Sequence, residues 1–486
     1  MRFRGSLLFI ALVTVFFFVG GFSAAYASPP ENARGVHATS GNGKAATQVF
    51  LPEGYTGAGY RNWIALNNVH DTEANTVSVR FYGNAGYIRT LTYVLEPRGR
   101  GTVDVNPFLN GGIEFCTRVS GTRSVVAERS TYRGTEGSSS RCCANPGEDS
   151  LFAHCLAEGY VDSANGYDCW ISIQNCTSSP ITVYLRFVDE GGANYPVGNP
   201  GRVKKDIPGY SRGTVHVNDY VPNGKAFVTR LWSSNKFCAE RVSYGPYFMH
   251  SSEGDPLGAL DFTGDATPTG GNSRSLTCGI SNPYYKVTSY IASGNYDSVG
   301  PLVYGFRYYK FDGSIYASNN DTIGTGIDNP PYANPARRST VSYTTPNNPA
   351  PVNGVMELWS LMVDEPYPRH VQWEQTTYRN NWWGYSVSGN HRFATKIYFA
   401  EGYTGYDDYI IIHNPSGRKK SYKVWFYWEG PPSGVSQIWV ENINPHCSSV
   451  VHVKDWVPAN TSVSVQIDPN TPYDPYTSAE RVTYFN

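Results

Sequence analysis

Short stretches in which apolar and polar residues alternate recur along most of this chain. Clear examples are Thr76–Tyr82, Ile181–Phe187 and Tyr422–Tyr427, in each of which every second residue is apolar. Alternation with a period of two predicts half-buried β-strands. Beyond residue 27, no stretch of the sequence carries the 3.6-residue apolar stripe of a helix. The pattern predicts an all-β protein.

A longer phrase repeats and divides the chain into units. It opens with Glu-Gly-Tyr, continues into a strand that ends in asparagine, and closes with Ala-Glu-Arg or a variant of it. The strand asparagines are Asn68, Asn175, Asn282 and Asn414, at intervals of 107, 107 and 132 residues. Self-similarity at a nearly fixed interval predicts a repeat protein. Each unit has the usual size of a β-sandwich domain, about 100 residues.

The predicted architecture is therefore four tandem immunoglobulin-like β-sandwich domains. We place their boundaries at 48–134 for repeat 1, 150–246 for repeat 2, 274–380 for repeat 3 and 394–486 for repeat 4. Repeat 3 is divergent, because it lacks the opening Glu-Gly-Tyr and carries an insertion, about residues 319–353, that we predict as an elaborated loop. Trp63, Trp170 and Tyr409 coincide in the repeat frame and are predicted as core residues.

The segments outside the repeats are predicted to lack regular structure. The joints 134–149, 251–274 and 380–392 are poor in apolar residues and are predicted as linkers. Residues 28–47 are small and polar, with Val36 as the only large aliphatic residue, and are predicted as a flexible lead-in. They lack the alternating apolar side chains that a strand inserted into a neighbouring subunit would need.

Residues 1–27 have the pattern of a secretory signal peptide. A basic start, Met1–Arg4, precedes an apolar run and the small-residue close Ala25–Ala27. We expect cleavage after Ala27, with an uncleaved membrane anchor as the alternative. No later apolar run reaches spanning length, so we expect a secreted or cell-surface protein with no membrane span after cleavage.

The charge balance changes the list of partners. Only 16% of the residues are charged and the formal net charge is −1. No basic field is present to attract nucleic acid, so the sequence argues against a nucleic-acid-binding role.

Nine cysteines in an exported chain predict disulfide bonds. Most of them cluster around repeat 2, and the candidates are Cys142, Cys143, Cys155, Cys169, Cys176 and Cys238. The connectivity stays open, and the odd count leaves at least one thiol unpaired or joined to another chain. Zinc is disfavoured because no Cys-x-x-Cys pair occurs.

The recurring glutamates are predicted to be structural rather than catalytic. A catalytic carboxylate pair is normally unique in a chain, whereas these glutamates return in repeat after repeat. Where a repeat opens with glutamate it closes with arginine, and repeat 3 has lost both, with Gln375 at the closing position. We therefore predict an ion pair between the first and last strands of each repeat that keeps both residues. The pairs are Glu53 with Arg129, Glu158 with Arg241 and Glu401 with Arg481.

Other chemistry finds little support. The sequence contains no nucleophile elbow, no His-Glu-x-x-His motif and no phosphate-binding glycine loop, so we expect a protein that is not an enzyme and needs no cofactor. Calcium at Asp407 and Asp408 is the alternative. Trp382 and Trp383 are candidate glycan contacts, although aromatic residues also serve as ordinary strand formers.

The phrase Ala-Glu-Gly-Tyr-Thr-Gly, a strand ending in Asn-Pro and the closing Ala-Glu-Arg-x-x-Tyr resemble the tandem repeats of prokaryotic secreted and cell-surface proteins. The resemblance implies immunoglobulin-like domains without assigned catalysis. The last closing phrase lies at the end of the sequence, with no sorting signal after it. We therefore expect a self-associating subunit of an extracellular filament, sheath or surface layer, held by its own copies or another envelope component. The alternative is a polysaccharide-binding adhesin or accessory module.

Overall fold

The structure is a computed structural model, and the regular elements of its described residues are β-strands apart from three short 3-10 helices. The prediction of an all-β chain is confirmed. No helix among the described residues is both long and apolar enough to cross a membrane. For repeat 3 the description is limited to the backbone of its strands. The described residues are 35–40, 45–109, 111–144, 153–156, 158–198, 201–246, 248–253, 255–256, 272–279, 287–295, 302–310, 315–323, 337–344, 354–361, 371–379, 383–388, 396–429, 434–470 and 478–485.

The first two repeats supply strands β2 to β20. In repeat 1 they are β2 (Ala46–Leu51), β3 (Arg61–Asn68), β4 (Asn75–Gly83), β5 (Gly86–Leu95), β6 (Arg100–Asp104), β7 (Cys116–Arg133), β8 (Glu136–Arg141) and β9 (Cys143–Ala144). In repeat 2 they are β10 (Ala153–Leu156), β11 (Tyr160–Val161), β12 (Asp168–Asn175), β13 (Ile181–Asp189), β14 (Asn194–Tyr195), β15 (Val203–Ile207), β16 (Arg212–His216), β17 (Lys225–Ser233), β18 (Phe237–Gly245), β19 (Phe248–Glu253) and β20 (Asp255–Pro256).

The last two repeats supply β21 to β35, and one further strand precedes repeat 1. Repeat 3 has β21 (Asn272–Gly279), β22 (Val287–Asn295), β23 (Leu302–Lys310), β24 (Ile315–Ile323), β25 (Arg337–Thr344), β26 (Gly354–Leu361), β27 (Val371–Arg379) and β28 (Trp383–Ser388). Repeat 4 has β29 (Ile397–Phe399), β30 (Asp407–His413), β31 (Lys420–Trp428), β32 (Gly434–Ile443), β33 (Ser448–His452), β34 (Val463–Pro469) and β35 (Ser478–Phe485), and the preceding strand is β1 (Gly35–Ser40).

Each repeat pairs its strands in the same antiparallel order. One sheet, called here the inner sheet, runs β16-β12-β18-β19 in repeat 2, β25-β22-β27-β28 in repeat 3 and β33-β30-β35-β1 in repeat 4. The other, outer sheet runs β24-β23-β26-β21 in repeat 3 and β32-β31-β34-β29 in repeat 4. In repeat 1 the long strand β7 belongs to both sheets, pairing with β4 and β2 through its first half and with β3 and β8 through its second.

The apolar residues of the alternating strands meet between the two sheets. In repeat 2, Ile171 and Ile173 of β12 share a buried cluster with Val183, Leu185 and Phe187 of β13. Equivalent clusters fill repeats 1 and 4. Burying such side chains contributes about 1.5–3 kcal/mol each, which is why the alternation along the sequence identifies these strands.

The recurring asparagine that marks each repeat is an internal cap. The side-chain amide of Asn175 donates to the carbonyls of Ser179, Ile207 and Pro208 at 2.8, 3.3 and 2.9 Å. Asn68 and Asn414 each donate to three carbonyls in the same way. One amide therefore joins two loops at the end of each sandwich of sheets, and Asn282 lies outside the described residues.

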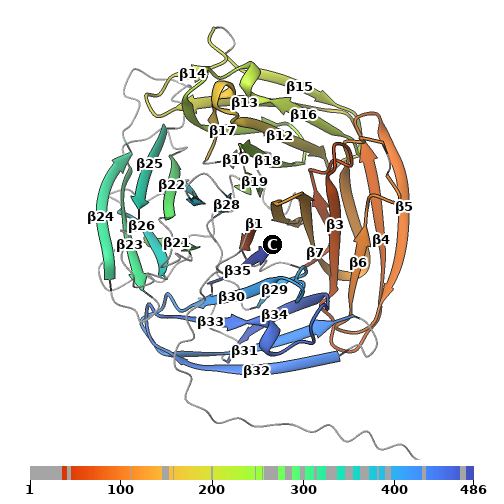
Figure 1. Ribbon diagram of the computed structural model, residues 1–486. Coiled ribbons are helices and arrows are strands. Elements are labelled where there is room, and N and C mark those ends of the chain that lie inside the picture. Colours follow the sequence, from red (N-terminus) through yellow and green to blue (C-terminus); the bar gives the residue numbers. More distant parts are fainter. Residues whose placement is uncertain are drawn as a thin grey trace, which may run out of the picture.

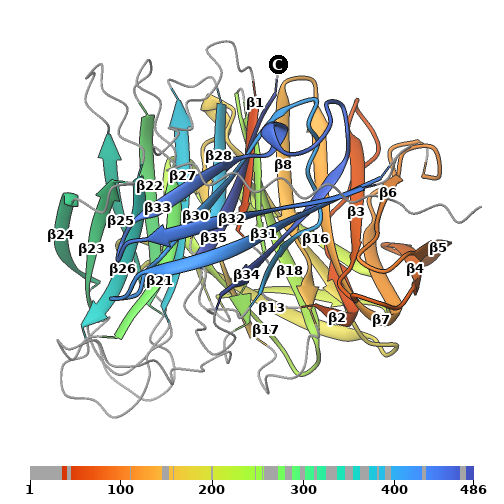
Figure 2. The ribbon, with the colours of Figure 1, turned by 90° about the horizontal axis from the view of Figure 1, so that it is seen from below.

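The repeats are arranged as a ring (Figure 1). At its centre lie β1, β8, β19 and β28, called here the central strands, each at the edge of the inner sheet of one repeat. β8 lies beside β1 and β19, and β28 lies beside the same two strands, so that the four enclose the axis. Figure 2 shows β1, β8 and β28 together in the middle of the molecule.

The central strand of repeat 4 comes from the opposite end of the chain. β1 pairs antiparallel with β35, from Gly35 opposite Phe485 to Ser40 opposite Glu480. The expectation of a flexible lead-in over 28–47 is therefore wrong for Gly35–Ser40, which closes the ring. The strand is not recognisable from apolar alternation because the described side chains that it buries include the polar His37 and Thr39.

The predicted linkers are corrected in the same way. The joint 134–149 contains β8 and β9, 251–274 overlaps β19 and contains β20, and 380–392 contains β28. The insertion 319–353 contains Arg337–Thr344, which is β25 and pairs with β22. These strands are rich in serine and charged residues, so composition gives them the look of loops.

Trp63, Trp170 and Tyr409 are half-buried rather than core residues. Trp170 stacks on His216 with ring centroids 4.2 Å apart, and Tyr409 stacks on His452 at 4.6 Å. Trp170 and Tyr409 thus cover neighbouring histidines on the face of the inner sheet that is turned away from the core.

Candidate functional site

The arginines that close the repeats occupy the most enclosed positions near the centre of the ring. Arg129, Arg241 and Arg481 lie on strands that pair with central strands, and their exposed fractions are 1%, 0% and 0%. A guanidinium in such a place is stable only when its charge and its N–H donors are matched. The groups that match them also join the repeats.

In repeats 2 and 4, the structure brings together the glutamate and arginine that the sequence pairs. Arg241 Nη2 lies 2.9 Å from Glu158 Oε2, and Arg481 Nη2 contacts Glu401 Oε2. Both carboxylates come from the loop after the first strand of the repeat and are less than a tenth exposed. Each pair therefore fastens the opening loop to the last strand.

Repeat 1 differs, and the predicted ion pair between the side chains of Glu53 and Arg129 is not formed. Arg129 Nη1 donates to the backbone carbonyl of Glu53 at 2.5 Å. The Glu53 carboxylate turns instead to repeat 2, where it accepts from Ser172 Oγ and from Arg212 Nη2, the latter at 2.8 Å. The opening glutamate thus contacts its own repeat in repeats 2 and 4, and contacts the neighbouring repeat in repeat 1.

The closing phrase itself joins neighbouring repeats, which sequence analysis missed. Arg129 grips Glu240 of repeat 2 with both ends of its fork, Nη2 to Oε1 at 2.5 Å and Nη1 to Oε2 at 3.0 Å. Arg481 Nη1 lies 3.0 Å from Glu128 Oε2 of repeat 1. The closing arginine of one repeat therefore binds the closing glutamate of the next in ring order. The joint recurrence of Glu and Arg in one phrase was the available signal.

A second arginine recurs at the first residue of an inner-sheet strand, β6 in repeat 1 and β16 in repeat 2. Arg212 lies between Glu53 and Glu114 of repeat 1, and Arg100 contacts Glu429 of repeat 4 and donates to the carbonyl of Ala400 at 3.1 Å. Both side chains are nearly fully buried. The shared Arg-Gly-Thr-Val sequence marks this inter-repeat contact.

Arg338 of repeat 3 has the same register as Arg212. It lies opposite Gly294, as Arg212 lies opposite Gln174. Arginine therefore occupies this register position in three of the four repeats, and repeat 4 has Ser448 there.

Several carboxyl groups surround Arg481. Besides Glu128 and Glu401, Asp408 places Oδ1 3.8 Å from Arg481 Nε and accepts from Thr483 Oγ1 at 2.8 Å. Burial raises the pKa of Asp408 to about 7, although Arg481 opposes the shift. Burial likewise raises the pKa of Glu128. Asp408 is therefore a carboxyl group whose pKa lies near neutral pH.

Around Arg481, the pKa of another carboxyl group, Glu401, is lowered instead of raised. Burial alone would raise the pKa of Glu401, but Arg481, His37 and Arg100 lower it. His37 of β1 is buried, and its Nε2 lies 3.0 Å from Tyr132 Oη. Burial lowers the pKa of His37 to about 4, so its imidazole is neutral at pH 7.

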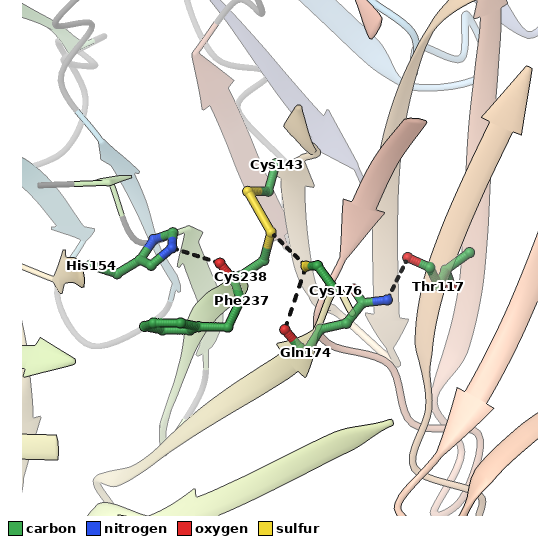
Figure 3. The surroundings of a disulfide bond; sticks show 7 residues. All are labelled: Thr117, Cys143, His154, Gln174, Cys176, Phe237 and Cys238. Atoms are coloured by element: carbon green, nitrogen blue, oxygen red, sulfur yellow. Dashed lines mark hydrogen bonds between the residues drawn. A yellow bond between two sulfur atoms is a disulfide. The ribbon is translucent and has the colours of Figure 1, made fainter. Parts of the chain in front are cut away.

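One pair of the candidate cysteines forms a disulfide. Cys143 of β9 is bonded to Cys238 of β18, which joins repeat 1 to repeat 2 (Figure 3). The thiol of Cys176 lies 3.5 Å from Cys238 Sγ and points to the carbonyl of Gln174 at 3.6 Å. Burial raises the pKa of Cys176 well above its ordinary value, so the group is a protonated thiol at neutral pH.

The other candidate cysteines have different surroundings. Cys169 lies in the core of repeat 2, where Ser243 Oγ contacts its sulfur at 3.8 Å. Cys142 is buried next to Cys143. Cys155 lies on β10, and its side chain is outside the described residues. Among the side chains that the structure describes, the bridging expected near repeat 2 takes the form of one bond between repeats 1 and 2.

The candidate calcium ligands are engaged elsewhere. Asp407 lies 2.6 Å from Lys454 Nζ, and Asp408 is the buried carboxyl group beside Arg481. Across the described ranges, no group of three or more His, Cys, Asp and Glu residues is arranged to hold a metal ion. Of the candidate glycan contacts, Trp382 lies outside the described residues, and Trp383 begins β28 with a side chain that is likewise outside them.

An aromatic face that the sequence analysis did not single out covers the outer sheet of repeat 4. Lys423 Nζ lies 3.8 Å from the ring centroid of Trp425 and 5.7 Å from that of Trp439, which is 40% exposed. Trp425 Nε1 donates to Asp468 at 3.0 Å, and Arg98 of repeat 1 lies 4.9 Å from the Trp425 centroid. In the sequence, this face was indicated by tryptophans at those positions of the alternating strands that are usually polar.

Comparison with known proteins gives little to extend this description. No protein-family model matches the sequence, and no curated protein matches it. Matches among solved structures include Bacteroides uniformis beta-glucuronidase 2 with a bound inhibitor, at 11% identity and a TM-score of 0.13 over 49% of this chain and 26% of that one. A calcium-binding mutant of that enzyme matches at 11% identity and a TM-score of 0.14 over 58% and 27%.

This chain thus spans about a quarter of the length of the two glucuronidase chains. A tetra-tandem repeat in the extending region of a large adhesion protein matches at 12% identity and a TM-score of 0.09, over 92% of this chain and 98% of that one. TM-scores this low carry no argument about fold or function, so the function must be argued from the ring and its contacts.

Proposed function

We propose that this protein is a non-catalytic, exported structural protein in which four immunoglobulin-like β-sandwiches form one closed disc, and that it works by associating with copies of itself at the cell surface. The disc is the functional unit of this proposal. Its inner contacts fix its shape, and its outer sheets meet other molecules.

The observation that carries the proposal is the place of the recurring charged residues. Glu128, Glu240, Arg129 and Arg481 bind one another across repeat boundaries and are at most 1% exposed. A carboxylate pair that cleaves a substrate has to meet that substrate, whereas these carboxylates are spent on joining repeats. Their recurrence is explained by assembly of the disc.

Export is supported by the cysteine chemistry as well as by the signal-like start of the sequence. The Cys143–Cys238 bond links two repeats, and structural disulfides persist mainly in oxidising compartments. The protein is accordingly placed outside the cytoplasm in this proposal.

Sedimentation velocity of the mature chain, residues 28–486, tests the proposal. Self-association predicts species larger than the monomer that grow as the concentration rises from low to high micromolar. Electron microscopy of the same samples would show an ordered assembly. A monomer throughout this range would contradict the proposal.

The second candidate function is polysaccharide binding, and the outer face of repeat 4 favours it. Trp439 and Trp425 with Lys423 and Asp468 combine flat rings with polar groups, which is the chemistry that stacks on sugar faces. Retention of the mature chain on insoluble polysaccharides, lost in Trp439→Ala, would support this function. The Tyr87→Ala variant on the outer sheet of repeat 1 is the matched control.

A further inference from the structure

The outer sheets of repeats 1 and 4 end in long strands with one open side. β5 is the end strand of its sheet and pairs with β4, and β32 is the end strand of its sheet and pairs with β31. Each is ten residues long. Within the described residues, neither has a strand paired to its other side, so each presents a row of backbone N–H and C=O groups.

Repeat 2 provides the internal contrast. Its end strand β15 has five residues, of which Lys204, Lys205 and Asp206 are consecutive charges. Short length and charge are the features by which proteins prevent strands of different chains from pairing. β5 and β32 contain no proline, and each has a single charged residue, Arg89 and Glu441. The protection present in repeat 2 is therefore missing from these two edges.

Exposed apolar side chains gather on the same two strands. Six large apolar side chains are exposed among the described residues, and four of them belong to β5 or β32. They are Tyr87 at 63%, Val94 at 65%, Val435 at 54% and Trp439 at 40%. Pairing of these strands with another chain would bury part of this surface as well as the backbone groups.

From these observations we infer that β5 of one copy pairs with β32 of a second copy. The inference rests on the proposed self-association and names the surfaces that carry it. Charge favours this pairing over β5 with β5 or β32 with β32, because only the mixed pairing offers opposite charges, Arg89 on one strand and Glu441 on the other. The partner of the open edges is therefore a second copy of this chain.

The geometry of the contact determines the kind of assembly. β5 and β32 are different surfaces of the same disc, at separate places on its rim (Figure 1). A contact between two different surfaces leaves one of each free after every addition, so it continues from copy to copy. The expected product is a chain of discs rather than a symmetric dimer.

Two edge-blocked variants of the mature chain test the inference. Val94→Lys with Tyr87→Lys places charges on β5, and Val435→Lys with Trp439→Lys places them on β32. Each blocked variant alone should sediment as a monomer at concentrations where the unmodified chain assembles. An equimolar mixture of the two should form a dimer and nothing larger, because each supplies the edge that the other lacks.

Ser78→Lys on β4, one strand in from the edge and opposite Thr92 of β5, is the matched control and should assemble like the unmodified chain. A charge exchange adds a second measurement: Arg89→Glu should lower the apparent association constant at least tenfold, and Arg89→Glu with Glu441→Arg should restore it. If the unmodified chain stays monomeric, the proposed function fails together with the inference. If it assembles and the blocked variants assemble equally well, the inference alone is overturned.

Discussion

The two joints on either side of repeat 1 are built from the same positions but with different chemistry. Toward repeat 2, the chain runs directly from one repeat to the next. The Cys143–Cys238 bond adds to the ion pair in which Arg129 donates two hydrogen bonds to Glu240. Toward repeat 4, the joint is non-covalent, and Arg481 is surrounded by several carboxylates. The first is here called the continuous joint and the second the closure joint.

The difference shows how a ring of repeats is closed. At the continuous joint the chain itself and the Cys143–Cys238 bond keep the partners close, and the contacts of Arg129 and Arg212 add to them. At the closure joint the two ends of the chain must find each other, and β1 contributes a whole strand together with His37 and Thr39. The closure joint therefore depends on non-covalent contacts alone, and its loss should be the more damaging.

Removal of β1 should have the largest effect. Deleting residues 28–40 from the mature chain leaves one side of β35 unpaired and exposes groups such as Thr483 and Arg481, which lie opposite β1. Each buried polar group left unmatched costs about 1–3 kcal/mol, so the total should exceed the effect of any single substitution below. We expect an open, more extended particle with a lower Tm. Small-angle scattering and calorimetry measure both, and an unchanged radius of gyration would refute closure by β1.

Arg481→Ala should follow, because it removes the charge that several buried carboxylates share. Breaking a buried ion pair costs about 3–5 kcal/mol, and we expect Arg481→Ala to be more destabilising than Arg129→Ala at the equivalent position of the continuous joint. Urea unfolding measures this difference.

Double-mutant cycles sharpen the same comparison between repeats. With glutamate changed to glutamine and arginine to methionine, Glu401 with Arg481 and Glu158 with Arg241 should show coupling of about 2 kcal/mol. Glu53 with Arg129 is the internal control, with coupling below about 0.5 kcal/mol, because that carboxylate binds Arg212 instead. Equal coupling in all three pairs would contradict the structure.

The closure joint also shows where sequence analysis reaches its limit. Alternation identified strands such as Ile181–Phe187, because each has one face in an apolar core. The central strand β8 has no such face: it contains Ser138, Ser139 and Ser140, all buried among neighbouring strands. Small polar residues let strands approach closely, but their pattern is that of a loop.

The ion pairs also differ in how far the sequence reveals them, depending on whether they lie within one repeat or between two. Glu158 with Arg241 and Glu401 with Arg481 are contacts within a repeat, so the joint loss of both partners in repeat 3 could reveal them. Arg129 with Glu240 joins two repeats. The recurrence of both residues in one phrase indicates a shared contact, but the repeat that supplies the partner follows only from the order of repeats around the ring.

At the continuous joint, Cys143→Ser should have a smaller effect than Arg481→Ala. The bond spans 95 residues, and removal of a native disulfide typically costs about 2–4 kcal/mol. Because Cys176 Sγ lies 3.5 Å from Cys238 Sγ, we expect a Cys176–Cys238 bond to replace it when the variant is air-oxidised. Peptide mapping under non-reducing conditions identifies the pair. Recovery of Cys238 as a free thiol after oxidation would count against this expectation, and Cys176→Ser, which keeps the original bond, is the control.

The smallest net effect is expected from pH, because two groups at the closure joint titrate in opposite directions. The pKa of Asp408 is raised to about 7 in the folded protein, so its contribution to stability is fully present below about pH 4 and is lost as the pH rises through 7. The pKa of His37 is lowered to about 4, so its contribution is present above about pH 6.5 and is lost as the pH falls through 4. The raised pKa of Glu128 adds to the first trend and the lowered pKa of Glu401 to the second.

These opposing trends should leave the unmodified protein with a change of less than about 2 kcal/mol between pH 4 and pH 7. In Asp408→Asn the titration of His37 is no longer opposed, so stability should fall as the pH is lowered. In His37→Gln the titration of Asp408 is no longer opposed, so stability should rise as the pH is lowered. Asparagine fits at 408 because Asn62 has the same register in repeat 1, where it accepts from Thr131 Oγ1 at 2.9 Å as Asp408 accepts from Thr483. Urea unfolding at four pH values measures the slopes, and parallel profiles for the three proteins would show that neither group controls the closure joint.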